Sequence, residues 1–221
     1  MRTFLLPGFG EEPWIFDQIA PQVGGEWIRI SHRDLMGDAQ RTGYDVQQYA
    51  QALVEAHGIT RDDRLIGHSM GGWIAYAVKQ LTGSPIVQIG SWTDPDKVVL
   101  LVKDPPKVYW LVRHGLYLNR LNKWYFGWRS YRGRPSRVVF ERVFQHLIDS
   151  PQGYVLNQLQ VILTPVRWSA PQAPDLRIHA LADTIVRPPD EPFAEVPGDH
   201  FCLATEAEAV STAIAGVLSE R

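Results

Sequence analysis

Short apolar runs alternate with longer segments of helical periodicity along most of the chain. The runs are too short and too uniformly apolar for half-exposed antiparallel strands, and they suit a parallel sheet that is covered on both faces. Six runs have this character: Thr3–Leu6, Trp27–Ser31, Arg64–Ile66, Ile86–Ile89, Leu176–Ala180 and Phe193–Val196. The pattern therefore predicts an α/β fold with a sheet of about six parallel strands and helices on both faces.

Three segments between or after these runs have apolar residues at helical spacing. Tyr44–His57 repeats its apolar side chains every three or four residues, and Gly58 follows as a helix-ending residue. Met70–Leu81 comes directly after the third run, and Ala204–Leu218 lies near the end of the sequence. We expect all three to be helices that cross over between, or pack on, the strands.

The region from Trp92 to Ala170 breaks the alternation, because it lacks short strand-like runs and is rich in helical stretches, Trp, Tyr and Arg. Between Asp94 and Pro165 it contains eleven Lys and Arg against five Asp and Glu, so its net charge is about +6 and that of the remainder about −8. We therefore predict a helical insert over residues 93–170, a lid, within a core formed by residues 1–92 and 171–221.

The bulk properties indicate one globular domain. The chain has 221 residues, 45% of them hydrophobic and 21% charged, with a net charge of −2. That balance gives no global attraction to nucleic acid. One cysteine, Cys202, excludes an intramolecular disulfide. No apolar stretch approaches the roughly 20 residues that span a bilayer, and the N-terminal apolar run ends at Pro7 and Gly8, so we expect a cytoplasmic protein.

The strongest chemical signal is the sequence Gly-His-Ser-Met-Gly-Gly at residues 67–72, directly after a predicted strand and before a predicted helix. A serine on such a sharp strand-to-helix turn needs small neighbours, which accounts for Gly67 and Gly71. Its Oγ would lie beyond the carboxyl end of the sheet, at the positive end of the helix. Ser69 is thus the candidate nucleophile; the alternative is a serine that only caps the helix.

Three further segments follow in the order that such a site requires. The Gly-rich turn within Leu5–Gly10 can place the Phe9 amide beside Ser69, where it would form an oxyanion hole with the Met70 amide. Asp183 follows the strand at 176–180, and His200 lies on a turn before the last helix. The order Ser, Asp, His favours a catalytic triad. Alternatively, the Gly-rich segment is an ordinary turn, Asp183 is a solvated loop residue, and His200 is a surface or core residue without a catalytic role.

With these segments, the chain resembles the α/β-hydrolase superfamily, and within it the small, lid-bearing serine esterases. The resemblance covers nearly everything outside the Trp92–Ala170 insert, which falls where the family has its lid. The sequence departs from the family in beginning almost on the strand before Phe9, so we expect a sheet that lacks the two N-terminal strands usual in the family. Pro7 stands where many members have histidine, which leaves the detail of the oxyanion hole open.

The resemblance implies acyl chemistry without a cofactor. His200 would take the proton of Ser69, Asp183 would orient the imidazole, and the amides of Phe9 and Met70 would bind the oxyanion. Asp199 is a rival for the acid role, although adjacent side chains on one turn rarely face each other. Asp94 and Asp96 are better rivals, because some members place the acid after the preceding strand. No cluster has the spacing of metal ligands, so we predict no metal.

The insert suggests what the enzyme acts on. Its aromatic residues either pack on the sheet's edge as a plain cap with solvated arginines, or line an acyl or aryl pocket beneath a basic rim. Such a rim would attract an anionic substrate or an acidic carrier protein. The leading function is hydrolysis of a small-molecule carboxylic ester or thioester. The alternatives are a C–C bond hydrolase or lyase that uses the same triad, and a non-catalytic ligand receptor on this scaffold.

Overall fold

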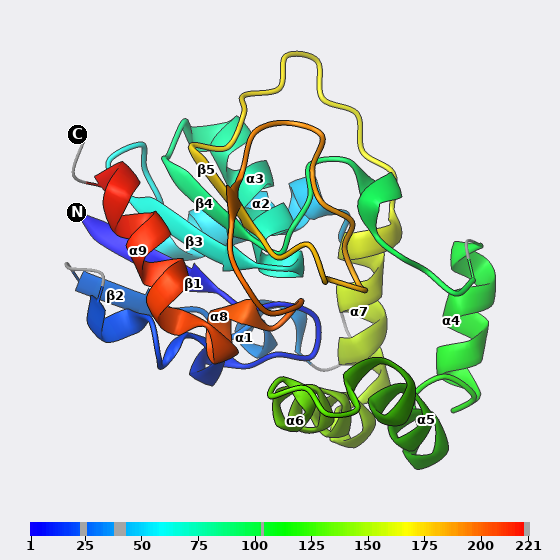
Figure 1. Cartoon of the computed structure of the whole chain (residues 1–221). Coiled ribbons are helices and arrows are strands. Elements are labelled where there is room, and N and C mark those ends of the chain that lie inside the picture. Colours follow the sequence, from blue (N-terminus) through cyan, green and yellow to red (C-terminus); the bar gives the residue numbers. More distant parts are fainter. Residues whose placement is uncertain (23–25, 38–42, 103, 219–221) are drawn as a thin grey trace.

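The chain folds around a six-stranded sheet in which all pairings are parallel, in the order β2-β1-β3-β4-β5-β6. The computed structural model describes residues 1–22, 26–37, 43–102 and 104–218; Lys103, one of the basic residues counted in the insert, lies outside them. The strands are β1 (Arg2–Leu6), β2 (Glu26–Arg29), β3 (Arg64–His68), β4 (Ile86–Ile89), β5 (Leu176–His179) and β6 (Ala194–Glu195) (Figure 1). The predicted α/β fold is confirmed.

Helices cover both faces of the sheet because the strands are apolar on both sides. Phe4 and Leu6 pack on one face with α2 (Val46–His57) and α3 (Met70–Thr82), whereas Leu5 packs on the other with α9 (Ala207–Leu218). The sequence sets the ends of α2: Asp45 and Gln48 form a capping box, and Gly58 takes the left-handed conformation that ends the helix. The short elements are divided between the faces: α1 (Arg33–Met36) packs on the side of α2, and η1 (Pro13–Phe16) and α8 (Cys202–Thr205) pack on the side of α9. The turn η2 (Ala20–Gln22) follows η1.

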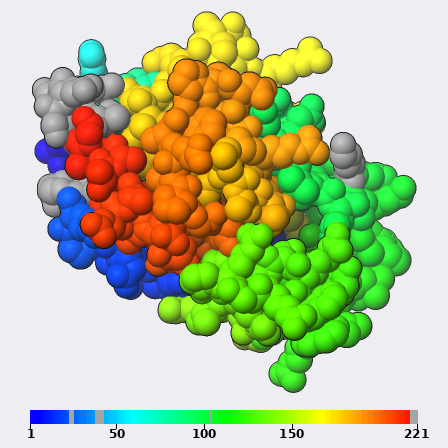
Figure 2. Space-filling view, viewed as in Figure 1, coloured from blue at the N-terminus to red at the C-terminus, as the bar shows by residue number. Residues whose placement is uncertain are grey.

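Four helices and a short turn separate β4 from β5. They are η3 (Pro95–Lys97), α4 (Pro105–Arg113), α5 (Arg120–Tyr131), α6 (Arg137–Asp149) and α7 (Gln152–Leu163). We call α4–α6 the cap; Figure 2 shows it in green as a lobe that projects from the lower right of the molecule. The helix α7 instead belongs to the main core, since Tyr154, Val161 and Ile162 pack there and the Val161 carbonyl accepts a 3.0 Å hydrogen bond from Trp73 Nε1. The boundaries 93–170 of the insert remain a prediction.

The C-terminal region differs from the expected single helix over Ala204–Leu218. It forms α8 and α9, with a non-helical Glu206 between them. The α8 turn is tied to the preceding loop by a bond from the Cys202 amide to the Asp199 carbonyl, while α9 lies along the sheet with Val210 and Ile214 in the core. Cys202 and Leu203 of α8 pack in the same cluster as α9, so the break at Glu206 changes the helix direction and not the core that the two helices cover. None of the helices in the described ranges has the length and apolar character needed to cross a membrane.

Candidate active site

Ser69 lies on a strained turn between β3 and α3. Its φ of 51° makes it the only non-glycine residue with positive φ among those that the structure describes. The neighbouring glycines are sterically required, because a Cβ on Gly67 would lie 2.3 Å from the Gly71 carbonyl oxygen and one on Gly71 would lie 1.9 Å from the Leu6 carbonyl oxygen. The Ser69 side chain makes no capping hydrogen bond to α3. The turn therefore presents the hydroxyl rather than using it as a cap.

The end of β4 holds this turn in place. The Ser69 amide donates to the Ile89 carbonyl at 3.0 Å, and the Ser69 carbonyl accepts from Ser91 Oγ at 2.7 Å. Gln88 Nε2 donates to the carbonyls of Gly72 and Trp92, both at 2.9 Å. Ser91 and Gln88 were not predicted as site residues, because a buried polar side chain on a strand gives no signal in the sequence of what it binds.

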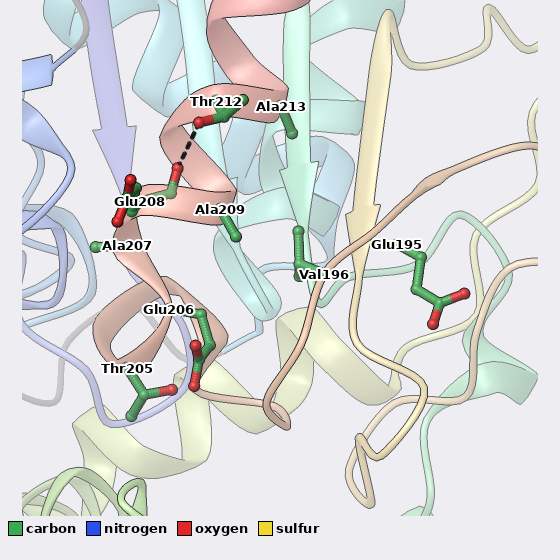
Figure 3. A pocket seen from close by; sticks show the side chains of 9 residues that line it. All are labelled: Glu195, Val196, Thr205, Glu206, Ala207, Glu208, Ala209, Thr212 and Ala213. Carbon is green, nitrogen blue, oxygen red and sulfur yellow. Dashed lines mark hydrogen bonds between the residues drawn. The ribbon is translucent and has the colours of Figure 1, made fainter.

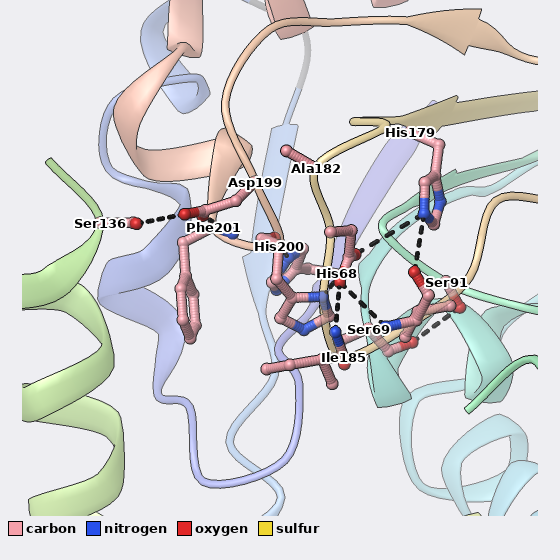
Figure 4. Close-up of polar contacts among 12 residues, drawn as sticks. His68, Ser69, Ser91, Ser136, His179, Ala182, Ile185, Asp199, His200 and Phe201 are labelled. Atoms are coloured by element: carbon pink, nitrogen blue, oxygen red, sulfur yellow. Dashed lines mark hydrogen bonds and ion pairs between the residues drawn. The ribbon is translucent and has the colours of Figure 1, made fainter. Parts of the chain in front are cut away.

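Asp183 is the carboxylate that binds His200. The distance between His200 Nδ1 and Asp183 Oδ2 is 2.8 Å, while Asp183 Oδ1 accepts from the amides of Ile185 and Val186 at 2.7 and 2.9 Å. Burial alone would raise the pKa of Asp183, but His200 and the two amides outweigh burial and hold the pKa below its ordinary value. The rivals Asp94 and Asp96 are exposed, and Asp94 binds the amide of Asp96. Figure 4 shows His200, His68 and Ser69 close together.

The Gly-rich loop after β1 lies directly beside Ser69. A Cβ on Gly8 would be 2.9 Å from the Ser69 Cβ, so the two backbones approach closely. Among the described residues, no acceptor binds the amide of Phe9 or of Met70. The Pro7 carbonyl faces His32 Nε2 at 2.9 Å. Both amides are therefore unpaired, and each directly follows a residue of this close approach, Gly8 or Ser69.

A buried pair, Glu11 and His68, connects the Gly-rich loop with the loop of His200. Glu11 Oε1 lies 2.8 Å from His68 Nδ1, and Glu11 Oε2 accepts from the Gly8 amide at 2.5 Å. His68 Nε2 lies 2.8 Å from the His200 carbonyl oxygen, which can only accept. The ring must therefore carry a proton on Nε2, and facing an ionised Glu11 it carries one on Nδ1 as well.

The position of the proton agrees with the electrostatics of the pair. Burial alone would lower the pKa of His68, but the Glu11 carboxylate and the His200 carbonyl outweigh burial and raise the pKa above its ordinary value. His68 and Glu11 are both buried. The sequence gives no signal of this pair, because His68 stands there only as the residue before Ser69 and Glu11 only as one acidic residue after the Gly-rich turn.

Comparisons with known proteins identify the family and the fold. A sequence model of the alpha/beta hydrolase family matches residues 4–216. The chain belongs to the alpha/beta hydrolase family. An esterase from Exiguobacterium antarcticum has a similar structure, with a TM-score of 0.71 and 16% identity over 98% of this chain and 91% of that one. A hydrolase from Pseudomonas aeruginosa has a TM-score of 0.75 and 13% identity over 98% and 89% of the two chains.

A more distant similarity is to the RedJ thioesterase of the prodiginine pathway in Streptomyces coelicolor, with a TM-score of 0.54 and 18% identity over 98% of this chain and 90% of that one. No curated protein sequence matches the chain. At these identities the solved structures establish the fold, and the chemistry has to be argued from this hydrolase's own site.

The cap of this alpha/beta hydrolase is anchored to the turn that carries His200. Asp199 Oδ2 accepts from Ser136 Oγ at 2.5 Å and lies 3.3 Å from Arg134 Nη1, and Figure 4 shows Ser136 and Asp199 pointing toward each other. Phe201 packs with Tyr131 and the phenylalanines of α6. Asp199 is thus committed to the cap, which agrees with its rejection as the partner of His200.

The candidate site is covered in this structure. Ser69 is 6% exposed and His200 3% exposed. A surface hollow of about 640 Å³ lies elsewhere, between β6, α8 and α9, where three glutamates line it: Glu195, Glu206 and Glu208 (Figure 3). It includes none of the predicted catalytic residues. In the described ranges, no group of three or more His, Cys, Asp or Glu side chains could hold a metal ion.

Proposed function

We propose that this hydrolase cleaves carboxylic esters or thioesters through an acyl-enzyme intermediate on Ser69. The observation that supports this most strongly is the pairing of the strained Ser69 turn with a buried Asp183–His200 hydrogen bond at the same edge of the sheet. A strained backbone is maintained where function requires it, and a carboxylate-bound imidazole is the base that a serine nucleophile needs.

The proposed reaction follows from the donors and acceptors of the site. Asp183 accepts a hydrogen bond from Nδ1–H of the neutral His200 ring, so Nε2 is the nitrogen that takes the Ser69 proton as Oγ attacks the acyl carbon. The developing oxyanion would be bound by the free amides of Phe9 and Met70. His200 then passes its proton to the leaving alcohol or thiol, and the reverse sequence with water releases the acid and restores Ser69.

The proposal also includes a lid over residues 93–170, and the cap formed by α4–α6 is part of that lid. Ser69 and His200 are buried, and the cap is anchored to the His200 turn through Asp199, so we expect the position of the cap and the geometry of the base to be linked. The substrate would be a small-molecule acyl ester or thioester. An acidic carrier protein that presents it, and a cytoplasmic location, remain predictions.

Hydrolysis of short-chain p-nitrophenyl esters tests the proposal. We expect the wild type to release a burst of nitrophenol as the acyl-enzyme forms, and Ser69→Ala to lower kcat by roughly 10⁴-fold or more. Ser169→Ala, which changes an exposed serine, is the matched control and should leave the rate unchanged. A Ser69→Ala variant that folds and keeps the wild-type rate would refute the proposal.

A further inference from the structure

The helix α5 turns an apolar stripe of its own toward the solvent. Leu121, Trp124, Tyr125 and Trp128 occur at the i, i+3, i+4 and i+7 spacing that normally marks the buried side of a helix, yet all four are exposed, Leu121 by 72% and Trp124 by 62%. The rings of Trp124 and Trp128 stack with centroids 6.5 Å apart. We call these four side chains the outer face of α5.

This exposure is not the result of a helix that lacks a packing partner. On its opposite side α5 packs against α6, where Tyr131 stacks on Phe140 with a centroid distance of 4.5 Å. Gly127 on this side is buried, and a Cβ there would lie 3.5 Å from the Phe140 ring. The packing within the chain is therefore complete without the outer face.

Positive charge borders the outer face. Arg120 and Arg129 are exposed on either side of the stripe, and exposed Arg132 follows the end of the helix. Among the described residues none of the three has a carboxylate at ion-pair distance; the nearby ion pairs are Lys107–Asp104 and Arg137–Glu141. The net charge of residues 94–165 is about +6 while that of the remainder is about −8, so an anionic surface would attract this end of the molecule and repel the rest.

We propose that the outer face of α5 docks on an anionic lipid surface. Tryptophan and tyrosine favour the boundary between lipid headgroups and acyl chains, and flanking arginines bind anionic headgroups. The convex face of a single helix can insert into lipid without a complementary groove. A second copy of the chain fits the charges less well, because a symmetric contact would bring the same three arginines together.

Vesicle co-sedimentation tests the docking directly and does not depend on enzymatic activity. We expect the full chain to bind vesicles of phosphatidylcholine mixed with phosphatidylglycerol, to bind pure phosphatidylcholine more weakly, and to lose affinity as salt increases. Leu121→Asp should weaken binding about tenfold or more. Leu81→Asp, which changes an exposed leucine at the end of α3, should bind like the wild type.

The charge contribution has its own matched pair of variants. Arg120→Glu should reduce binding to the anionic vesicles, whereas Arg167→Glu, the same change at an exposed position outside the cap, should reduce it much less. Equal binding by Leu121→Asp and Leu81→Asp, or no vesicle binding by the wild type, would overturn the proposal. A wild-type dimer that Leu121→Asp converts to monomer in sedimentation velocity would overturn it in favour of a second copy. Retention on an immobilised acidic protein without vesicle binding would assign the face to a protein partner instead.

Discussion

The edge of the sheet buries charged side chains, whereas the cap exposes large apolar ones, and both differ from the usual arrangement in folded proteins. At the sheet edge, Glu11, His68 and Asp183 are charged or able to carry charge, and their side chains are almost fully buried. On α5, two tryptophans and a leucine lie in the solvent. Folded proteins usually neither bury charged groups nor expose large apolar patches, because an unpaired buried charge and a large exposed apolar patch both cost free energy.

The two regions differ in whether their unusual side chains have partners within the chain. Each buried group at the sheet edge has its partners within the chain: Glu11 binds His68 and Gly8, and Asp183 binds His200 and two amides. The outer face of α5 stays exposed among the described residues, whereas the inner face packs against α6. The first region therefore acts by holding its own geometry, and the second by contacting something outside the molecule.

The largest effect is expected from Asp183→Asn, which removes the charge at the sheet edge while keeping the shape. An amide can present its NH₂ group to His200 and favour the wrong tautomer, so kcat for ester hydrolysis should fall by about 10⁴-fold. Asp94→Asn and Asp96→Asn alter exposed carboxylates and should leave kcat within about twofold of the wild type. A large loss in either of these with none in Asp183→Asn would move the acid role to the earlier loop.

Glu11→Gln tests the buried pair through stability. Since Glu11 and His68 are both buried, the loss of the negative charge should lower the free energy of unfolding by about 2–4 kcal/mol. The folded-state pKa of His68 is raised above 6.5, so the contribution of the pair is fully present below pH 6.5 and is lost as the pH rises through the raised pKa. Denaturant titrations of both proteins across this range should show the difference shrinking as the pH rises.

The neighbouring glutamate supplies the control for that series. Glu12 pairs at the surface with Arg33 at 3.3 Å and with His146 at 3.2 Å. Glu12→Gln should cost less than about 1 kcal/mol, because solvent screens exposed pairs. If Glu11→Gln and Glu12→Gln are equally stable at all pH values, the buried pair does not have the role assigned to it.

The smallest effect is expected on α5, where Leu121→Asp should change the free energy of unfolding by no more than about 0.5 kcal/mol. By comparison, Leu53→Ala in the buried side of α2 should cost about 3 kcal/mol. Thermal unfolding of the two variants measures whether Leu121 contributes to stability as the buried Leu53 does. A Leu121→Asp variant that is as unstable as Leu53→Ala would show that the outer face is part of the protein's own core.

Sequence reasoning recovers the features that depend on local order. The strand before Ser69, the glycines around it and the succession of Asp183 and His200 are all visible as spacing along the chain. The Glu11–His68 pair is not, because its members are 57 residues apart and nothing in the sequence distinguishes buried Glu11 from half-buried Glu12. Periodicity likewise cannot decide which side of α5 is buried, since Tyr131 and Trp128 place aromatic groups on both sides. Packing on the sheet's edge was the wrong expectation for three of the insert's aromatic residues, Trp124, Tyr125 and Trp128, which are exposed.

Covalent labelling with a fluorophosphonate tests most directly whether the sheet edge activates Ser69. Intact-mass analysis should show one adduct on the wild type, located on the peptide that contains Ser69, and none on Ser69→Ala; His200→Ala should label far more slowly. Leu121→Asp should label like the wild type, because the outer face of α5 is assigned to docking and not to the chemistry. A folded wild-type protein that forms no adduct, or a Ser69→Ala variant that labels at the same rate, would contradict the account.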